Sequence, residues 1–472
     1  MNSFSRLVLL GIGLLVVTSC SEEFLEQTPQ QDLSIDNAVE DLTSLRAAVN
    51  GIYSNFQNPN MYGWDLPLLP ELRGDNAYIS FNNAGRFQQH DQFTLVDLDG
   101  RVGDEWLQHY SAVVNASNII QRYPDATFLS TETDQAQQLF GEAHAQRGLT
   151  YWNLVKLFAQ PYTNDNGQSP GVPLNNEGTT GELVSPPRAS VAEVYNQVIA
   201  DLEMGIQLMN TQTDGRLSAA AAQALLAKVH LYKEDWQNAE TLASAVIESG
   251  EYTLYADSAA WFGSWGMNFG SEDLFALVNT GTDNLGTNSI GGIIDQDGYG
   301  DVLATEDLLS SYSDTDYRRS FIVRGQRVGG EEDALFPVGK YPEGETGQDY
   351  IKIMRLSDVY LIRAEARAEL GNEDGARADL DAVASRRDAA YTDSEATGDA
   401  LVDAILEERR RELAFEGDRV YDLMRRKRTW TKFRNPTLDD EVVSWDNPQL
   451  INPIPRGELD NNPNITENNP GY

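Results

Sequence analysis

The segment LSAAAAQALLAKVHLYKEDWQNAETLASAVIESGEY (217–252) has the pattern of two short helices joined by a polar turn at Glu234 and Asp235. Ala227 lies in the first helix, and Ala239, 12 positions later, lies in the second. Small side chains at such positions let paired helices approach closely, as they do in tetratricopeptide repeats. The segment therefore predicts a mainly α protein with a tetratricopeptide-like helical-repeat scaffold.

A second segment, 356–388, repeats this plan, with Ala364 and Ala376 at the same spacing. Two such units cannot form a stable repeat protein alone, so we expect further helices to complete the scaffold. Apolar residues that alternate spacings of three and four predict these helices. They lie at about 38–56, 104–158 and 190–209.

Two stretches, 58–103 and 253–350, lack helical periodicity. The second is rich in Gly, Asn, Asp, Ser and aromatic residues, as in WFGSWGMNFG (261–270). Long irregular stretches in a compact protein are usually functional. We therefore expect a helical scaffold that carries two large loop insertions.

The N-terminus has the pattern of a lipoprotein signal peptide. Arg6 precedes an apolar run that is too short to span a bilayer, and the run ends in VTSC (17–20). Cys20 is the only cysteine, and we expect it to carry the lipid at the outer membrane surface. The predicted parts are a signal peptide (1–19), an N-terminal helical part (20–252) and a C-terminal part with the loop-rich insertion (253–472).

The charge balance excludes some partners. The chain has 35 Lys and Arg against 73 Asp and Glu, a net charge of −38. Such a charge repels a phosphate backbone, so we expect no nucleic-acid binding. It also disfavours strongly anionic glycans, unless a local arginine patch overrides it. A neutral glycan is therefore the expected ligand if the protein binds sugar.

Several motifs follow one another in an order that resembles one family. They are CSEEFLEQTP (20–29), AVNGIY (48–53), RLSDVYLIRAEA (355–366), ILEERRRELAFEG (405–417), YDLMR (421–425), PIP (453–455) and NNPGY (468–472). The chain is similar to the SusD/RagB-like family of outer-membrane glycan-binding lipoproteins. The resemblance implies a non-enzymatic protein that captures oligosaccharides for a SusC-like TonB-dependent transporter. A surface-attached glycoside hydrolase and an adhesion or structural lipoprotein are the alternatives.

The charged residues of these motifs have helical spacing, which suits ion pairs within or between helices. We interpret them as scaffold residues and not as ligand-binding residues. They are Glu408, Arg409, Glu412, Glu416, Arg419 and Asp422.

Sugar rings have apolar C–H faces that pack on aromatic rings, and their hydroxyl groups need polar partners. Three tryptophans lie in the two insertions and are the predicted platforms: Trp64, Trp261 and Trp265. The predicted polar or mixed partners in the same insertions are Asp75, Asn76, Arg86, Asn268 and Tyr299.

Catalytic and metal motifs are weak. GQSPG (167–171) matches a nucleophile elbow as a string, but Pro170 has no N–H to serve an oxyanion hole after Ser169. The four histidines lack ligand-type spacing, so we expect no zinc site. DQDGYGD (295–301) resembles part of a calcium loop but lacks its bidentate glutamate. We expect no cofactor, with calcium as an alternative.

Overall fold

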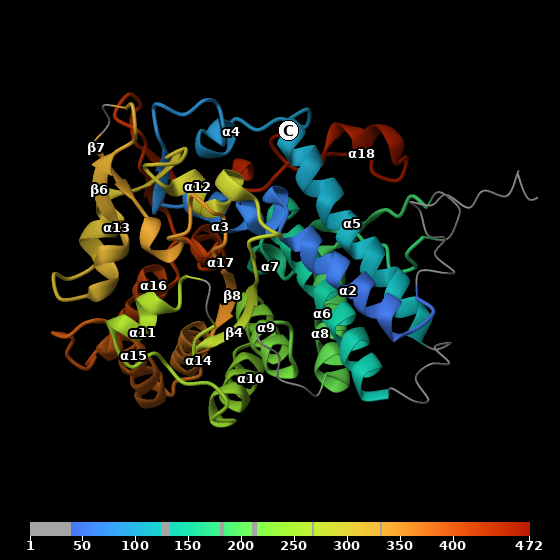
Figure 1. The fold of residues 1–472 in the computed structure, drawn as a ribbon, viewed down its shortest axis with the longest axis horizontal. Helices are drawn as coiled ribbons and strands as arrows, with labels where there is room; N and C mark the ends of the chain where they lie inside the picture. Colours follow the sequence, from blue (N-terminus) through green and yellow to red (C-terminus); the bar gives the residue numbers. More distant parts are fainter. Residues whose placement is uncertain (1–38, 124–132, 180–183, 210–214, 267–268, 331–332) are drawn as a thin grey trace, which may run out of the picture.

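Helices make up most of the molecule, and the longest of them lie together on one side (Figure 1). The computed structural model describes residues 39–123, 133–179, 184–209, 215–266, 269–330 and 333–472. The predicted fold class, mainly α, is confirmed. Within the described ranges, no helix has both the length and the apolar character needed to cross a membrane.

Four long helices form the N-terminal half: α2 (Leu42–Phe56), α5 (Gly100–Arg122), α6 (Thr133–Phe158) and α8 (Val191–Leu208). The cap residue Asp41 of α2 accepts a hydrogen bond from the N–H of Ser44, whose hydroxyl in turn bonds back to Asp41. This reciprocal cap satisfies N–H groups that the first turn leaves free. α2 lies within the helix predicted at about 38–56, and its buried face consists of Leu45, Val49, Ile52 and Phe56.

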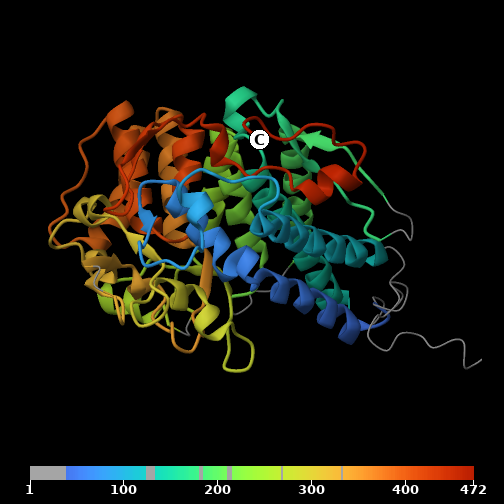
Figure 2. The same ribbon diagram turned by 90° about the horizontal axis from the view of Figure 1, so that it is seen from above.

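Two helix pairs have the predicted tetratricopeptide-like arrangement: α9 (Ala219–Tyr232) with α10 (Trp236–Glu248), and α14 (Leu356–Glu369) with α15 (Glu373–Arg387). Their contact alanines have no exposed surface: Ala227, Ala239, Ala364 and Ala376. Because α10 also packs against α14, the two pairs stack. Figure 2 shows the C-terminal helices at one end of the molecule and α2 with α5 at the other.

The first insertion contains a helix that the sequence did not predict. A π-helical turn, η3 (Pro59–Gly63), leads into α3 (Asp65–Arg73), and every residue of α3 is buried. Pro67 lies in its first turn and Pro70 in its interior, and apolar residues surround the axis, so no amphipathic stripe marks it. The expectation of an irregular 58–103 segment is therefore wrong for this part.

A further helix, α16 (Asp399–Leu413), follows α15, and short helices connect the longer elements: α4 (Gln88–Asp91), α7 (Tyr162–Asp165), α11 (Ser258–Gly263), α12 (Ile290–Ile294), α13 (Glu306–Ser311), α17 (Arg419–Arg425) and α18 (Arg456–Asn461). The described residues also form four 3-10 turns: η6 (Gly286–Asn288), η7 (Tyr317–Phe321), η8 (Val338–Lys340) and η9 (Pro448–Leu450). The second insertion therefore contains α11, α12, α13 and three of these turns, so the expectation of an irregular 253–350 segment holds only for the residues between them.

The strands of the described residues form five antiparallel pairs. They are β1 (Ala77–Ile79) with β5 (Val302–Ala304), β2 (Pro170–Pro173) with β3 (Arg188–Ser190), β4 (Asp273–Leu277) with β8 (Ile351–Arg355), β6 (Val323–Gln326) with β7 (Asp333–Phe336), and β9 (Trp430–Lys432) with β10 (Glu441–Val443). In the first pair, Tyr78 lies opposite Leu303. Since β1 comes from the first insertion and β5 from the second, this ladder joins the two insertions.

Candidate functional site

Arg86 joins the two insertions through its side chain. Its Nη1 lies 2.6 Å from Oδ2 of Asp301, and its guanidinium carbon lies 3.8 Å from the centre of the Tyr299 ring. The Tyr299 hydroxyl donates a hydrogen bond to Oδ1 of Asn288 at 3.1 Å. Two of the predicted site residues, Arg86 and Tyr299, are therefore brought into contact across more than 200 positions of sequence.

Arg327, after strand β6, approaches the same carboxylate. Its Nη1 lies 3.8 Å from Oδ1 of Asp301 and donates to the carbonyl of Asn82 at 3.0 Å. The Asp301 side chain is fully buried beneath the two arginines. Burial, the larger effect, leaves the pKa of Asp301 above its ordinary value, although Arg86 and Arg327 pull it down.

Three segments thus meet on one surface, because the N–H of Val328 also bonds to the carbonyl of Gln296. Phe81 and Val328 are exposed apolar side chains there, at 47% and 70%. We call this surface the loop face and define it by Phe81, Asn82, Arg86, Gln296, Tyr299, Arg327 and Val328. It combines apolar surface, a stacked aromatic ring and donors, which are the groups that a sugar ring needs.

Trp64 lies at the base of the first insertion and is almost fully buried. Its ring meets Phe87 edge to face at 5.8 Å, and Arg101 lies over it at 5.5 Å. Arg101 in turn pairs with Asp65 at 2.7 Å. The Trp64 indole therefore packs against Phe87 and Arg101 on the inner side of the first insertion.

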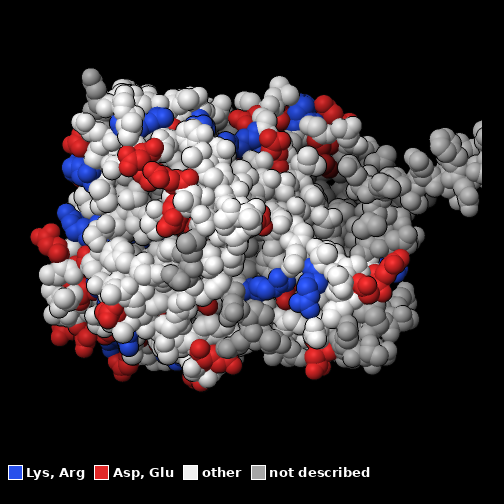
Figure 3. Space-filling model, viewed as in Figure 1, with Lys and Arg blue, Asp and Glu red and all other residues white. Residues whose placement is uncertain are grey.

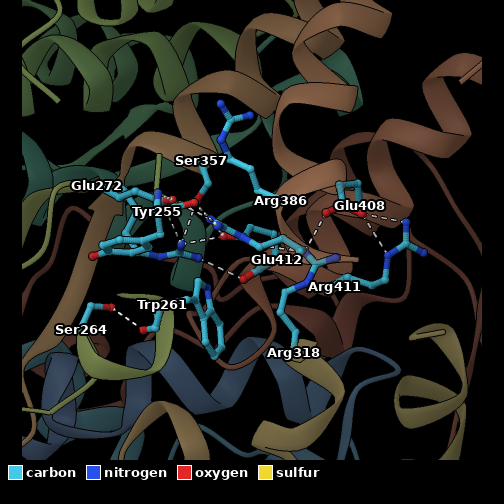
Figure 4. Close-up of polar contacts among 12 residues, drawn as sticks. Tyr255, Trp261, Ser264, Glu272, Arg318, Ser357, Arg386, Glu408, Arg411 and Glu412 are labelled. Atoms are coloured by element: carbon cyan, nitrogen blue, oxygen red, sulfur yellow. Dashed lines mark hydrogen bonds and ion pairs between the residues drawn. The ribbon is translucent and has the colours of Figure 1, made fainter. Parts of the chain in front are cut away.

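Trp261 and Trp265 correct the sequence-based prediction, because neither has any exposed surface. Their rings pack edge to face at 5.5 Å, and Lys340 lies over both. Tyr341 also meets Trp265 at 6.1 Å. Figure 4 shows Trp261 in the interior beside Arg318 and Glu412. These tryptophans anchor α11 to the core and offer no face on which a sugar could stack.

Asp75 and Asn76 also correct the prediction. Both oxygens of Asp75 accept hydrogen bonds from Arg419, at 2.6 and 2.7 Å. Asn76 is fully buried, donates to Glu71 and accepts from Arg410. Their polar groups hold the first insertion on the C-terminal helices instead of facing a ligand. Asn268 lies outside the described residues.

The motif charges form a buried ion-pair network, as interpreted from the sequence. Arg318, Arg355 and Arg387 converge on Glu412, with contacts of 2.7 to 3.1 Å. Burial opposes ionisation of Glu412, but the three arginines hold its pKa well below its usual range. Separate pairs join Arg409 to Asp358 and Asp422. These side chains bind each other and hold the scaffold.

The serine and the histidines that could suggest catalysis or metal binding form hydrogen bonds with neighbouring protein groups. Ser169 donates its hydroxyl proton to Asp165 at 2.6 Å. The histidines bond to different groups: His90 to Arg73, His109 to the carbonyl of Glu105, His144 to Asp201 and His230 to Asp235. In the described part of the chain, no three His, Cys, Asp or Glu side chains form a group that could hold a metal ion.

The 295–301 turn is shaped by its own hydrogen bonds. Oδ1 of Asp295 accepts from the N–H of Asp297, and the N–H of Tyr299 donates to the carbonyl of Gly292. Asp301, the last acid of the calcium-like string, is engaged by Arg86. Calcium binding stays a prediction from the sequence.

Arg327 and Phe81 were missed by the sequence-based prediction. Arg327 stands alone between glycines in GQRVGG (325–330), and Phe81 follows a strand of three residues. Neither has a local pattern that marks it. The only signal available was their position inside the two insertions, and the β1–β5 ladder that unites these insertions is too short to predict.

A stacked helical-repeat scaffold with a loop face of aromatic, apolar and donor groups is the architecture of a binding protein. The chain matches the family model described as "Starch-binding associating with outer membrane" over residues 23–231 and the SusD family model over residues 333–472. It is 27% identical to SusD-like protein P2 of Formosa agariphila, over 97% of this chain and 98% of that protein.

Solved structures agree with these matches. A SusD superfamily protein from Bacteroides thetaiotaomicron superposes with a TM-score of 0.84 at 27% identity, over 91% of this chain and 100% of that chain. A SusD superfamily protein from Bacteroides vulgatus gives 0.84 at 29% identity, over 92% and 99%. The chain belongs to the SusD family. Members of this family are carbohydrate-binding proteins and not enzymes.

Proposed function

We propose that this protein is an outer-membrane lipoprotein that captures oligosaccharides on its loop face and delivers them to a SusC-like TonB-dependent transporter. Cys20 carries the lipid that holds it at the cell surface. The family description, which names starch binding and association with the outer membrane, supports this function. The order of the N-terminal charged, apolar and small residues supports the anchor.

The observation that carries the proposal is the contact between Arg86 and Tyr299. It builds one surface from two insertions that are distant in sequence, and the Arg86 side chain remains 27% exposed. Phe81 supplies an exposed ring and is next in the chain to Asn82, whose carbonyl accepts a hydrogen bond from Arg327. Stacking on the apolar C–H face and donation to ring hydroxyls are the two contacts that fix a sugar in place.

The site is tested with a panel of oligosaccharides, followed by calorimetry on Tyr299→Ala. Removing the ring also removes the support beneath Arg86, so we expect affinity to fall at least about tenfold. Tyr360→Ala is the matched control, because Tyr360 lies under Arg363 on α14, away from the insertions. Equal affinity of both folded variants and the wild type would place the site elsewhere. Failure of the wild type to bind any glycan would refute sugar capture.

The transporter partner is tested by co-purification from gently solubilised outer membrane. We expect a large TonB-dependent barrel protein to accompany the chain, because capture at the surface requires a separate route for import. Recovery of the free chain alone, under conditions that preserve other membrane complexes, would contradict the partner while leaving glycan binding untouched.

A further inference from the structure

The loop face carries more positive than negative charge at its centre. Arg86 and Arg327 approach opposite oxygens of one carboxylate, that of Asp301, at 2.6 and 3.8 Å. Asp301 is fully buried, but the side chains of Arg86 and Arg327 are 27% and 23% exposed. One carboxylate balances one of the two guanidinium groups. The solvent side of this cluster therefore has an excess of one positive charge.

Both arginines keep donors for a ligand. Arg86 uses Nη1 for Asp301, and Arg327 uses Nη1 for Asn82 and Asp301. Their Nε and Nη2 atoms have no acceptor among the residues that the structure describes. A guanidinium group presents such donors in a planar fork that matches the two oxygens of a carboxylate or sulfate.

The overall charge of −38 does not decide this contact. At physiological ionic strength, the interaction of exposed charges is largely screened beyond about 8 Å. Figure 3 shows basic side chains along the edge near the β6–β7 hairpin and a group of acidic side chains beside them, near α12. The exposed acid in the turn of Tyr299 is Asp297. Among the described residues, the ion pairs of Arg86 and Arg327 are both with the buried Asp301.

We propose that the ligand captured on the loop face is an acidic oligosaccharide, with a carboxylate or sulfate group held by Arg86 and Arg327 and its ring packed on Phe81. This inference rests on the proposed sugar-binding function and replaces the neutral ligand expected from net charge. Arg327 is then a specificity-determining residue, because it supplies the positive charge that Asp301 does not balance.

The test uses pairs of probes that differ only in charge. Oligogalacturonate is compared with its methyl ester, and carrageenan oligosaccharides are compared with their desulfated forms, by calorimetry at low and high salt. We expect the charged member of one pair to bind at least about tenfold more tightly, with an advantage that falls as salt increases. The two pairs distinguish a carboxylate ligand from a sulfate ligand.

Substitutions of single charged residues test which side chain causes the preference for the charged probe. Arg327→Gln should remove most of the preference for the charged probe, and Asp297→Asn should leave it equal or larger. Arg324→Gln is the matched control on the same hairpin, because Arg324 is paired with its own carboxylate, Glu306, at 2.5 Å. An unchanged preference in folded Arg327→Gln protein would overturn the assignment.

The remaining outcomes distinguish the proposal of an acidic ligand from the proposed function, sugar capture, on which it rests. If neutral probes bind as tightly as their charged partners, the acidic ligand is refuted and sugar capture stands. If no probe of either kind, and no glycan of the wider panel, binds the folded wild type, both proposals fail together.

Discussion

Arg387 and Glu412 lie in contact in the interior, with Nη2 3.1 Å from Oε1 and neither side chain exposed to solvent. Glu412 belongs to α16 and Arg387 ends α15. Arg355, at the end of β8, and Arg318, in η7, reach the same carboxylate. Glu412 therefore connects η7, in the second insertion, to the helices α15 and α16.

Replacing this glutamate should destabilise the fold strongly. Glu412→Gln keeps the shape of the side chain but leaves three buried arginines with one carboxylate fewer. Loss of one partner from a buried ion pair costs about 3–5 kcal/mol of unfolding free energy. Urea denaturation measures the difference. Glu407→Gln is the control on the same helix, because Glu407 is 40% exposed and its nearest arginine nitrogen lies 3.8 Å away. We expect the control to change stability by less than about 0.5 kcal/mol.

The buried tryptophans should affect stability and not ligand affinity. Trp265→Phe removes part of an indole that has no exposed surface and lies under Lys340 and Arg355. The cavity should cost about 1–3 kcal/mol. A thermal melt should show the loss, while the folded variant binds glycan with the affinity of the wild type. Weaker binding without any loss of stability would mean that the indole faces ligand after all.

The lipid anchor has its own test. In Cys20→Ala the thiol that would receive diacylglycerol is gone, and we expect the protein to leave the membrane fraction for the soluble fraction. Membrane fractionation of cells that carry either form measures this. Cys20 is the only cysteine, so the substitution removes no disulfide. Wild-type protein that is released as completely as the variant would contradict the anchor.

The sequence was sufficient for the scaffold because helix pairs obey local rules. The spacing of Ala227 and Ala239 was enough to predict a close contact, and both residues are buried as expected. The sequence did not predict helix α3, because Pro67 and Pro70 interrupt its apolar pattern and the helix is buried on all sides. Local periodicity marks an element only when one of its faces meets water.

The candidate site was only partly predictable. Arg86 and Tyr299 were expected from their residue types and do meet, but Trp261 and Trp265 were expected on the same grounds and are buried. An aromatic residue in an irregular segment can pack inward or outward, and only the long-range contacts decide which. The buried charges of Lys340 and Arg355, which lie over the Trp265 ring, supply such contacts and come from more than 50 positions away.

Asp349, near the end of the second insertion, should make stability depend on pH. Its Oδ1 accepts a hydrogen bond from the N–H of Glu343, but its buried Oδ2 has no hydrogen-bond partner among the described residues. The pKa of Asp349 is raised to about 7, mainly by burial; the hydrogen bond from the N–H of Glu343 opposes this rise, and the carboxylates of Glu343 and Asp295 add to it. In the unfolded chain the same carboxyl has a pKa of about 3.9.

The direction in which stability changes with pH follows from proton binding. Between about pH 4 and pH 7 the folded protein keeps the Asp349 proton that the unfolded chain has lost, so this residue lowers stability as pH rises through that window. Asp349→Asn cannot ionise. Its stability relative to the wild type should therefore grow from about pH 4 to pH 7, by at most about 1.4 kcal/mol per pH unit, and level off above. Urea denaturation across this range measures the curve, with Asp297→Asn, a change at an exposed aspartate, as the control. A stability difference that is flat with pH would show that Asp349 ionises normally in the folded protein.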